Sequence, residues 1–170
     1  AANVALNIQA LGANPIICSV VGNDKEGDEF ISLLQTQLIS EEGIVRVDNR
    51  STTVKTRGIG HKQQILRIDL ETNDPIKEEI SVAVLEKIRV FLEKTEIHAI
   101  IFEDYDKGVL NPWLIQEAIK LANEKKIITV VDPKNRNFLE YKNVTLFKPN
   151  VKELREGLKL GMINHDVFPV

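Results

Sequence analysis

Three short apolar runs in the second half of the chain, each followed by polar residues, constrain the fold more than any other feature. The runs span residues 98–102, 127–131 and 144–147, and the polar segments after them begin at Glu103, Asp132 and Lys148. Continuously apolar runs are typical of parallel strands that helices cover on both faces. Ligands of open parallel sheets lie beyond the carboxyl ends of the strands, so we expect the polar segments to face one crevice.

The segment between the first two runs has the pattern of an amphipathic helix. Asn111 stands at the position of a helix cap, and Pro112 occupies the first helical position. Apolar residues then recur at helical spacing up to Ala122. The two runs and this helix therefore predict a βαβ unit with a right-handed crossover, which places the chain in the α/β class.

The first 43 residues predict the beginning of the same α/β core. We expect a helix capped by Asn3 and closed by Gly12, then a strand from Pro15 to Val21. The turn at residues 22–24 leads into a second helix. Its predicted apolar side consists of Phe30, Ile31, Leu33, Leu34 and Leu38.

Residues 44–70 have a different pattern, closer to strict alternation. Lys55 and Arg57 alternate with Val54 and Thr56, and residues 58–62 form a glycine-containing turn. This pattern predicts antiparallel strands with one exposed face, standing apart from the main sheet as a small β lid. A polar loop at 71–75 and a helix at 77–94 return the chain to the core, so residues 71–170 are predicted to continue it.

Composition excludes several classes of protein. The chain has 170 residues, 43% of them hydrophobic and 28% charged, which is typical of a globular domain. A net charge of -3 gives no sign of a nucleic-acid or membrane-surface partner. Cys18 is the only cysteine, and we find no apolar stretch long enough to cross a bilayer, so we expect a cytoplasmic protein. The histidines His61, His98 and His165 lack metal-ligand spacing.

Both ends of the sequence suggest an excerpt. The chain starts without methionine and within a predicted helix, and it ends soon after a predicted helix that should lead into further sheet. We therefore expect an α/β domain that is incomplete at both ends.

Several short strings, in order along the chain, resemble the PfkB or ribokinase-like sugar kinases. Asn3-Val-Ala5, Gly12, Val21-Gly-Asn-Asp24 and Gly27 match the spacing of that family's first signature. Further strings resemble the branch that phosphorylates heptose 7-phosphate for ADP-heptose synthesis. They are residues 53–57, Gln63-Gln-Ile-Leu-Arg67-Ile-Asp69, Asp104-Tyr-Asp-Lys-Gly108, Asp132-Pro-Lys134 and 149–153. The resemblance implies a ribokinase-like fold, in which an antiparallel lid covers the sugar and in several relatives also forms the dimer contact.

The resemblance also implies ATP and Mg²⁺ as cofactors. Asn150 and Glu153 match a family motif that orders the metal through water, and Lys134 could meet the nucleotide phosphates. The same spacing of Asn150 and Glu153 also predicts an ordinary helix capping box, and the two roles are compatible. Lys134 could equally be a solvated lysine at the end of a strand.

The implied substrate is a phosphorylated sugar. The residues expected to bind it are Asn3, Lys55, Arg57, Gln64, Arg67, Asp104 and Lys107. Guanidinium groups can hold phosphate oxygens in a bidentate fork, which suits Arg57 and Arg67. The alternative is that the charges on an exposed sheet face serve only solubility, and that Asn3 serves only as a helix cap.

The family's catalytic base, an aspartate in a Gly-Ala-Gly-Asp turn, has no counterpart in these residues. We expect it beyond Val170, and we expect these 170 residues alone to be inactive. Two other functions stay open: a related kinase for another sugar or a nucleoside, and a fragment that only binds or dimerises. No Gly-x-Gly-x-x-Gly follows a strand and no P-loop string occurs, which argues against dinucleotide-binding and P-loop enzymes.

Overall fold

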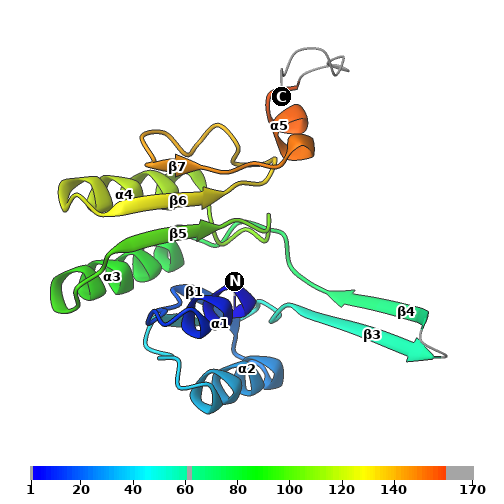
Figure 1. Cartoon of the computed structure of the whole chain (residues 1–170). Coiled ribbons are helices and arrows are strands. Elements are labelled where there is room, and N and C mark those ends of the chain that lie inside the picture. The colour runs from blue at the N-terminus through cyan, green and yellow to red at the C-terminus, as the bar shows by residue number, and fades with distance from the viewer. Residues whose placement is uncertain (1, 61–62, 160–170) are drawn as a thin grey trace. The chain divides into compact units, whose positions relative to one another are not determined.

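The computed structural model describes residues 2–60 and 63–159. The chain divides into two compact units. The first unit runs to Glu96 and also includes Lys107–Val109, and the second comprises Ile97–Asp106 and the chain from Leu110 onward. Figure 1 shows the helices and strands of both units.

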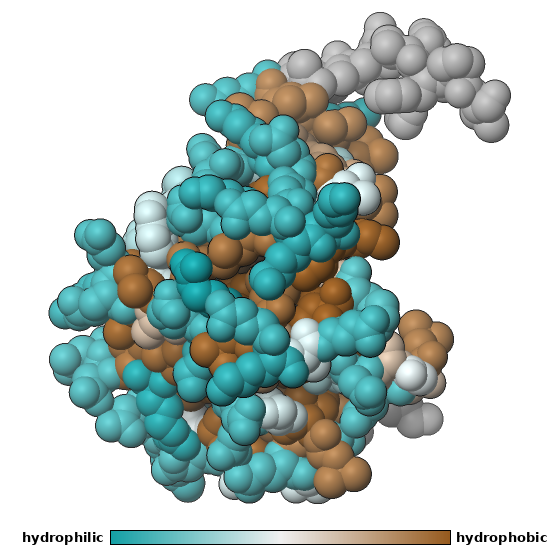
Figure 2. Space-filling view, turned by 90° about the vertical axis from the view of Figure 1, so that its left-hand side faces the viewer, coloured by the Kyte–Doolittle hydropathy of each residue, from teal (hydrophilic) through white to brown (hydrophobic). Residues whose placement is uncertain are grey.

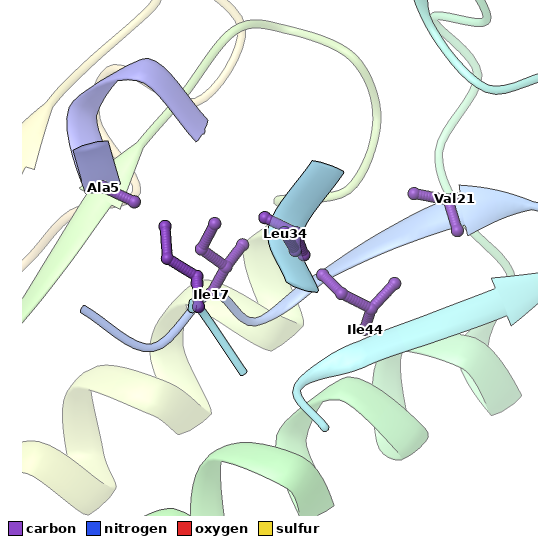
Figure 3. Packing of buried hydrophobic residues seen from close by; sticks show 6 residues of the cluster. Ala5, Ile17, Val21, Leu34 and Ile44 are labelled. Atoms are coloured by element: carbon purple, nitrogen blue, oxygen red, sulfur yellow. The ribbon is translucent and has the colours of Figure 1, made fainter. Parts of the chain in front are cut away.

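The first unit contains a parallel pair of strands, β1 (Ser19–Gly22) and β2 (Ile44–Val47). Helices α1 (Ala2–Ala10) and α2 (Lys25–Thr36) accompany this pair. Side chains from both strands and both helices form one hydrophobic cluster, whose buried members are Ala5, Ile17, Val21, Leu34, Ile39 and Ile44 (Figure 3). Burial of this apolar surface is the main force that holds these elements together.

The N-terminal elements differ from the prediction in four respects. Helix α1 begins at Ala2, so Asn3 lies in its first turn and is not its cap, whereas Gly12 ends the helix at φ +90° as expected. The first strand begins at Ser19, four residues later than predicted from Pro15. Leu33 and Leu38 were expected in the core, but their side chains are 56% and 90% exposed. Helix α2 ends at Thr36, so Leu38 is no longer on a helical face.

The antiparallel hairpin is shorter than the predicted lid segment of residues 44–70. Strand β2 pairs in parallel with β1 and is not part of the hairpin. Its first residue, Ile44, is buried in the core and lies opposite Ser19 in the register. The hairpin itself consists of β3 (Val54–Gly60) and β4 (Gln63–Leu70), with a bulge between Gly58 and Ile59. Helix α3 (Glu78–Lys94) follows and buries Val84, Leu85 and Leu92.

The hairpin has one charged face and one apolar face. Its register pairs Lys55 with Asp69 and Arg57 with Arg67. The alternate pairs form the other face, which carries Val54, Leu66, Ile68 and Leu70. The last three of these side chains are more than half exposed. The hairpin therefore exposes a hydrophobic surface as well as a charged one.

The second unit contains the predicted parallel sheet. Strands β5 (Ala99–Glu103), β6 (Ile128–Asp132) and β7 (Leu146–Phe147) are parallel and adjacent in that order. Helix α4 (Pro112–Glu124) begins after Asn111, whose side chain accepts a hydrogen bond from the Leu114 N–H over 3.0 Å. Helix α5 (Val151–Gly157) follows β7. These elements confirm the βαβ prediction and the α/β class.

One expectation about burial in this unit needs correction. Phe102 is buried, whereas Trp113 in helix α4 is 43% exposed. The sheet was expected to be covered on both faces. Instead, Ile101, Ile128 and Leu146 are 41%, 52% and 52% exposed on the face opposite Phe102 and Val131. Helix α4 supplies a fully buried apolar stripe, whereas the opposite face keeps accessible apolar side chains.

Figure 2 shows one face of the molecule, on which hydrophilic residues predominate and hydrophobic patches lie between them. Within residues 2–60 and 63–159, no helix has the length and hydropathy needed to span a membrane. The same residues contain no group of three or more His, Cys, Asp or Glu side chains arranged to hold a metal ion. His61 and His165 lie outside the described residues.

Candidate active site

The carboxyl ends of β5, β6 and β7 bring polar segments together at one edge of the second unit. The Asp104 N–H donates to the Asp132 carbonyl over 3.3 Å, and the Lys148 N–H donates to the Val131 carbonyl over 3.0 Å. The Lys148 ammonium lies 3.0 Å from the Asp132 carboxylate. The segments after the strands thus lie side by side, as expected for neighbouring parallel strands.

Lys134, Asn150 and Glu153 form one contact group at this edge. The Asn150 side chain accepts a hydrogen bond from the Glu153 N–H over 2.9 Å, and the Glu153 carboxylate accepts one from the Asn150 N–H over 2.8 Å. The Lys134 ammonium donates to the other carboxylate oxygen of Glu153. The predicted capping box is therefore present, and it contains the residues predicted to meet nucleotide and metal.

The electrostatics of this group keep both of its ionisable members charged. Burial raises the pKa of the Glu153 carboxyl, but the hydrogen bonds from Lys134 and the Asn150 N–H outweigh burial and lower the pKa overall. Burial also lowers the pKa of the Lys134 ammonium, and the contact with Glu153 more than reverses that effect. Each Glu153 oxygen accepts one hydrogen bond, one from Lys134 and one from the Asn150 N–H.

Asp104 is almost fully buried, at 3% exposure, and its carboxylate is surrounded by donors. The Tyr141 hydroxyl donates to its Oδ2 atom over 2.7 Å, and the Asn137 amide donates to the same atom over 3.0 Å. Burial and then the Asp104 charge raise the pKa of Tyr141, so the phenol stays protonated as a donor. Asn137 also donates to the Leu110 carbonyl over 2.8 Å. The Asn137 amide thereby joins Asp104, at the start of the 104–110 loop, to Leu110 at its end.

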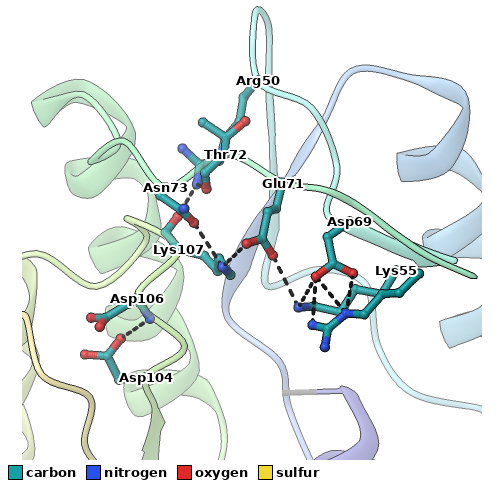
Figure 4. Close-up of polar contacts among 10 residues, drawn as sticks. Arg50, Lys55, Asp69, Glu71, Thr72, Asn73, Asp104, Asp106 and Lys107 are labelled. Carbon is teal, nitrogen blue, oxygen red and sulfur yellow. Dashed lines mark hydrogen bonds and ion pairs between the residues drawn. The ribbon is translucent and has the colours of Figure 1, made fainter. Parts of the chain in front are cut away.

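Asp106 adopts a left-handed backbone conformation, with φ +54°. Its N–H donates to the other oxygen of Asp104 over 2.9 Å (Figure 4). Burial and the nearby Asp104 charge raise the pKa of the Asp106 carboxyl. Among the described residues, the Oδ1 atom of Asp106 is buried and accepts no hydrogen bond. The loop is therefore held in a specific shape by Asp104.

Lys107 belongs to the first unit. There it contacts residues 71–75, which follow strand β4 and which we call the return segment of the hairpin. Its ammonium donates to Glu71 Oε1 over 2.5 Å and to Asn73 Oδ1 over 3.0 Å (Figure 4). The hydrogen bond from Lys107 lowers the pKa of the Glu71 carboxyl, and Lys55 adds to this effect while burial opposes it. Sequence reasoning assigned residues 71–75 to a plain loop and gave no signal for Glu71.

The charged face of the hairpin brings three predicted cations together. Lys55 lies 3.3 Å from Glu71 and 3.7 Å from Asp69 (Figure 4). Arg67 lies 2.7 Å from Asp69. Arg57 stands directly opposite Arg67 in the register. Directly opposed like charges destabilise a strand pair, so this face favours an additional anion. In the described part of the chain, no ion pair or hydrogen bond of the Arg57 guanidinium is found.

Asp24, the last residue of the Val21-Gly-Asn-Asp24 string, holds the segment that leads into strand β3 of the hairpin. The Thr52 N–H and hydroxyl both donate to the Asp24 carboxylate, over 2.8 and 2.6 Å. The Gly22 N–H donates to the Thr52 hydroxyl over 2.8 Å, and Asp24 also caps α2 through the Gly27 N–H. The hydrogen bonds from Thr52 lower the pKa of the Asp24 carboxyl. A Cβ atom at Gly22 would lie 2.2 Å from the Arg50 carbonyl oxygen, so this position requires glycine.

Two predicted residues lie apart from these contacts. Asn3 is exposed in the first turn of α1. Gln64 is exposed on β4, where it pairs in register with Ile59. Sequence reasoning missed Arg50, Glu71, Asn137 and Tyr141, which organise the contacts above. No motif pointed to these residues, since each acts through contacts with residues distant in sequence.

Comparison with known proteins gives a consistent result. The family model described as "pfkB family carbohydrate kinase" matches residues 1–161. The chain is 41% identical over 166 residues to the "Bifunctional protein HldE" of Helicobacter pylori (strain HPAG1), covering 97% of this chain and 35% of that protein. It is 39% identical over 157 residues to the protein of the same name in Wolinella succinogenes, covering 92% of this chain and 33% of that protein. The chain thus spans about a third of the length of these relatives.

Solved structures give the same fold at lower sequence identity. The phosphofructokinase-2 of Escherichia coli in complex with fructose-6-phosphate superposes with a TM-score of 0.71 and 19% identity. The match covers 97% of this chain and 54% of that chain. Together with the parallel sheets and the antiparallel hairpin, this likeness confirms the predicted ribokinase-like α/β architecture.

Proposed function

Because the chain belongs to the pfkB family of carbohydrate kinases, we propose that its full-length protein phosphorylates a sugar that already carries a phosphate. The substrate we propose is heptose 7-phosphate, which would become heptose 1,7-bisphosphate in the synthesis of ADP-heptose and the lipopolysaccharide core. Similarity to the HldE relatives supports this choice of sugar. In the reaction, the sugar hydroxyl oxygen forms a bond to the γ-phosphorus of ATP, the bond to the β-phosphate oxygen breaks, and the hydroxyl proton passes to a general base.

The observation that carries this proposal is the opposition of Arg57 and Arg67 on the charged face of the hairpin. Two guanidinium groups placed across a strand pair repel each other, and among the described residues Asp69 pairs with Arg67 but not with Arg57. A sugar phosphate supplies a further anion on this face and can accept bidentate hydrogen bonds from Arg57. Lys55 lies on the same face of the hairpin. Lys107 lies next to Lys55, because both ammonium groups contact the Glu71 carboxylate. We assign these four cations to the substrate phosphate and its surroundings.

For the nucleotide, we assign Lys134 to the ATP phosphates and the Asn150–Glu153 pair to Mg²⁺ through water. When bound, Mg²⁺ would neutralise charge that develops on the phosphoryl oxygens. Lys134 would add a fixed positive charge, because Glu153 keeps it protonated and holds it in place. Asn150 would orient Glu153 through the capping box.

The remaining predicted residues receive supporting roles. We assign Asn3 and Gln64 to sugar hydroxyls, because amides can both donate and accept hydrogen bonds. Asp104 is too buried to present its carboxylate to a large ligand without rearrangement. It would serve the substrate by fixing the loop from which the segment carrying Lys107 continues.

We further propose that two copies associate through the apolar face of the hairpin. Leu66, Ile68 and Leu70 expose more than half of their side-chain surface there, and a second hairpin would cover them. An Ile68→Glu variant should then elute as a monomer in size-exclusion chromatography coupled to light scattering. A monomeric unsubstituted protein would refute this contact. We place the protein in the cytoplasm, where ATP and sugar phosphates are available.

The test of the proposed activity compares phosphorylated with unphosphorylated sugars. The full-length protein is incubated with Mg²⁺-ATP and heptose 7-phosphate, fructose 6-phosphate or unphosphorylated heptose, and ADP release and ³¹P NMR spectra are recorded. We expect kcat/KM to be highest for heptose 7-phosphate, with a new phosphorus resonance for the anomeric phosphate. A kcat/KM for unphosphorylated heptose that equals or exceeds it would refute the proposal.

A further inference from the structure

Arg50 occupies an unusual position at the base of the hairpin. Its guanidinium donates to three backbone carbonyls, namely those of Asp74 over 3.1 Å, Thr72 over 3.3 Å, and Lys107. Within the described residues, no salt bridge of Arg50 with a carboxylate is found, although the Asp74 charge is near. A planar guanidinium with five donors can hold several carbonyls at once, which an ammonium cannot do in the same geometry.

These contacts connect three segments that are distant in sequence. Arg50 lies in the segment that leads into strand β3. In the same segment, Thr52 donates two hydrogen bonds to the Asp24 carboxylate. Thr72 and Asp74 belong to the return segment after β4. The third acceptor belongs to Lys107–Val109, the segment of the first unit that carries Lys107. Arg50, which lies just before the hairpin, therefore joins the segment after the hairpin to the segment that carries Lys107. We call these three contacts the Arg50 clamp.

Neighbouring contacts make this junction close-packed. The Ile76 N–H donates to the Gly108 carbonyl over 2.9 Å. A Cβ atom at Gly108 would lie 1.9 Å from the Asp74 carbonyl oxygen. The Lys107 side chain also reaches back to Glu71 and Asn73 on the return segment. A shift of the return segment would thus move the Lys107 ammonium.

We propose that Arg50 is a positioning residue, which sets the place of Lys107 for binding of the substrate phosphate by locking Lys107–Val109 to the return segment of the hairpin. This inference rests on the proposed function, because it assumes that Lys107 contacts the phosphosugar. Arg50 itself does not touch the substrate. Its loss should weaken sugar-phosphate binding and leave ATP binding unchanged.

The first measurement does not depend on activity. Hydrogen exchange of the Ile76 amide is followed in the unsubstituted full-length protein and in the Arg50→Ala, Arg50→Lys and Arg89→Ala variants. Arg89 is a matched control, because within residues 2–60 and 63–159 the only hydrogen bond and ion pair found for its guanidinium join it to the exposed Glu86 in the same helix. We expect Ile76 to exchange at least about tenfold faster in both Arg50 variants and at the unsubstituted rate in Arg89→Ala. Unchanged exchange of Ile76 would overturn the clamp.

The second measurement separates positioning from general damage. In Arg50→Lys, the KM for heptose 7-phosphate should rise roughly tenfold, while the KM for ATP stays the same. In a Lys107→Ala background, Arg50→Lys should have no further effect on the sugar-phosphate KM, because Arg50 acts through Lys107. Faster exchange of Ile76 without a change in this KM, or additive effects of the two substitutions, would overturn the inference.

Failure of the proposed function gives a different result. An unsubstituted protein that phosphorylates no sugar phosphate would refute the proposed substrate, and Ile76 exchange would then decide the clamp alone. Should Arg50→Ala not fold, Arg50→Lys keeps the charge and supplies the same comparison.

Discussion

The Nζ atom of Lys107 lies 2.5 Å from Oε1 of Glu71, while the Lys55 ammonium lies 3.3 Å from the other oxygen of the same carboxylate. One acidic side chain therefore holds two of the cations that we assign to the substrate phosphate. A bound phosphate would meet this negative charge beside its own ligands. The charge of Glu71 should consequently oppose phosphate binding, while its hydrogen bonds position the two lysines.

Glutamine at this position removes the charge, keeps one acceptor oxygen and releases the lysine that faced the other oxygen, so it should strengthen sugar-phosphate binding. In Glu71→Gln, we expect the KM for heptose 7-phosphate to fall by roughly three- to tenfold, with the KM for ATP unchanged. Steady-state kinetics of the full-length protein measure both constants. Glu79→Gln is the control, because Glu79 is an exposed glutamate that pairs only loosely with Lys77. A rise in the sugar-phosphate KM would show that Glu71 assists binding, contrary to this account.

Gly108 should tolerate substitution far less than Gly12, although both have positive φ angles, +74° and +90°. A Cβ atom at Gly108 meets backbone at 1.9 Å, whereas a Cβ atom at Gly12 meets nothing within 4 Å. Gly12→Ala should cost about 1 kcal/mol of unfolding free energy from backbone strain alone. Gly108→Ala should cost at least about 2 kcal/mol more. Urea denaturation of the two variants gives the comparison, and equal losses would contradict the close packing at Asp74.

The buried hydroxyl of Tyr141 should stabilise the second unit through Asp104. Tyr141→Phe leaves the Asp104 carboxylate without one of its donors, which should lower the unfolding free energy by about 1–3 kcal/mol. The same chemical change at Tyr105 is a matched control, because that side chain is 48% exposed and its hydroxyl lies 3.3 Å from Glu103. Tyr105→Phe should change the unfolding free energy by less than about 0.5 kcal/mol. A Tyr141→Phe variant as stable as Tyr105→Phe would argue against the network.

Glu153 should make stability depend on pH in the acid range. Its folded-state pKa is lowered below the ordinary value of 4.5, so its contribution is present above that value and disappears as the pH falls through the folded-state pKa. Glu153→Gln removes this contribution and should flatten the acid limb of a plot of unfolding free energy against pH. Chemical denaturation at a series of pH values measures the effect. An acid limb identical to that of the unsubstituted protein would contradict the role of Glu153.

Sequence reasoning found the parallel sheet because continuous apolar runs and the Asn111-Pro112 helix start are local signals. It also found the charged face of the hairpin, because alternation places Lys55 and Arg57 on one side. It mistook Ile44–Val47 for part of the lid. A strand of four residues has too short a pattern to reveal whether its partner is parallel or antiparallel.

The contacts that organise the candidate site could not be read from local patterns. Arg50 acts on Thr72, Asp74 and Lys107, and Asp104 is held by Asn137 and Tyr141. These partners are between 22 and 57 residues apart in sequence. Their spacing obeys no helical or strand period, so only the fold brings them together.

The central claim is that the charged face of the hairpin binds the phosphate of the sugar substrate. The most direct measurement is the KM of the full-length protein for heptose 7-phosphate and for unphosphorylated heptose, before and after Arg57→Ala, with Arg89→Ala as the control. Loss of a bidentate contact to phosphate should raise the KM for heptose 7-phosphate by roughly ten- to a hundredfold and leave that for heptose unchanged. An unchanged KM for heptose 7-phosphate in Arg57→Ala and in Arg67→Ala would contradict the claim.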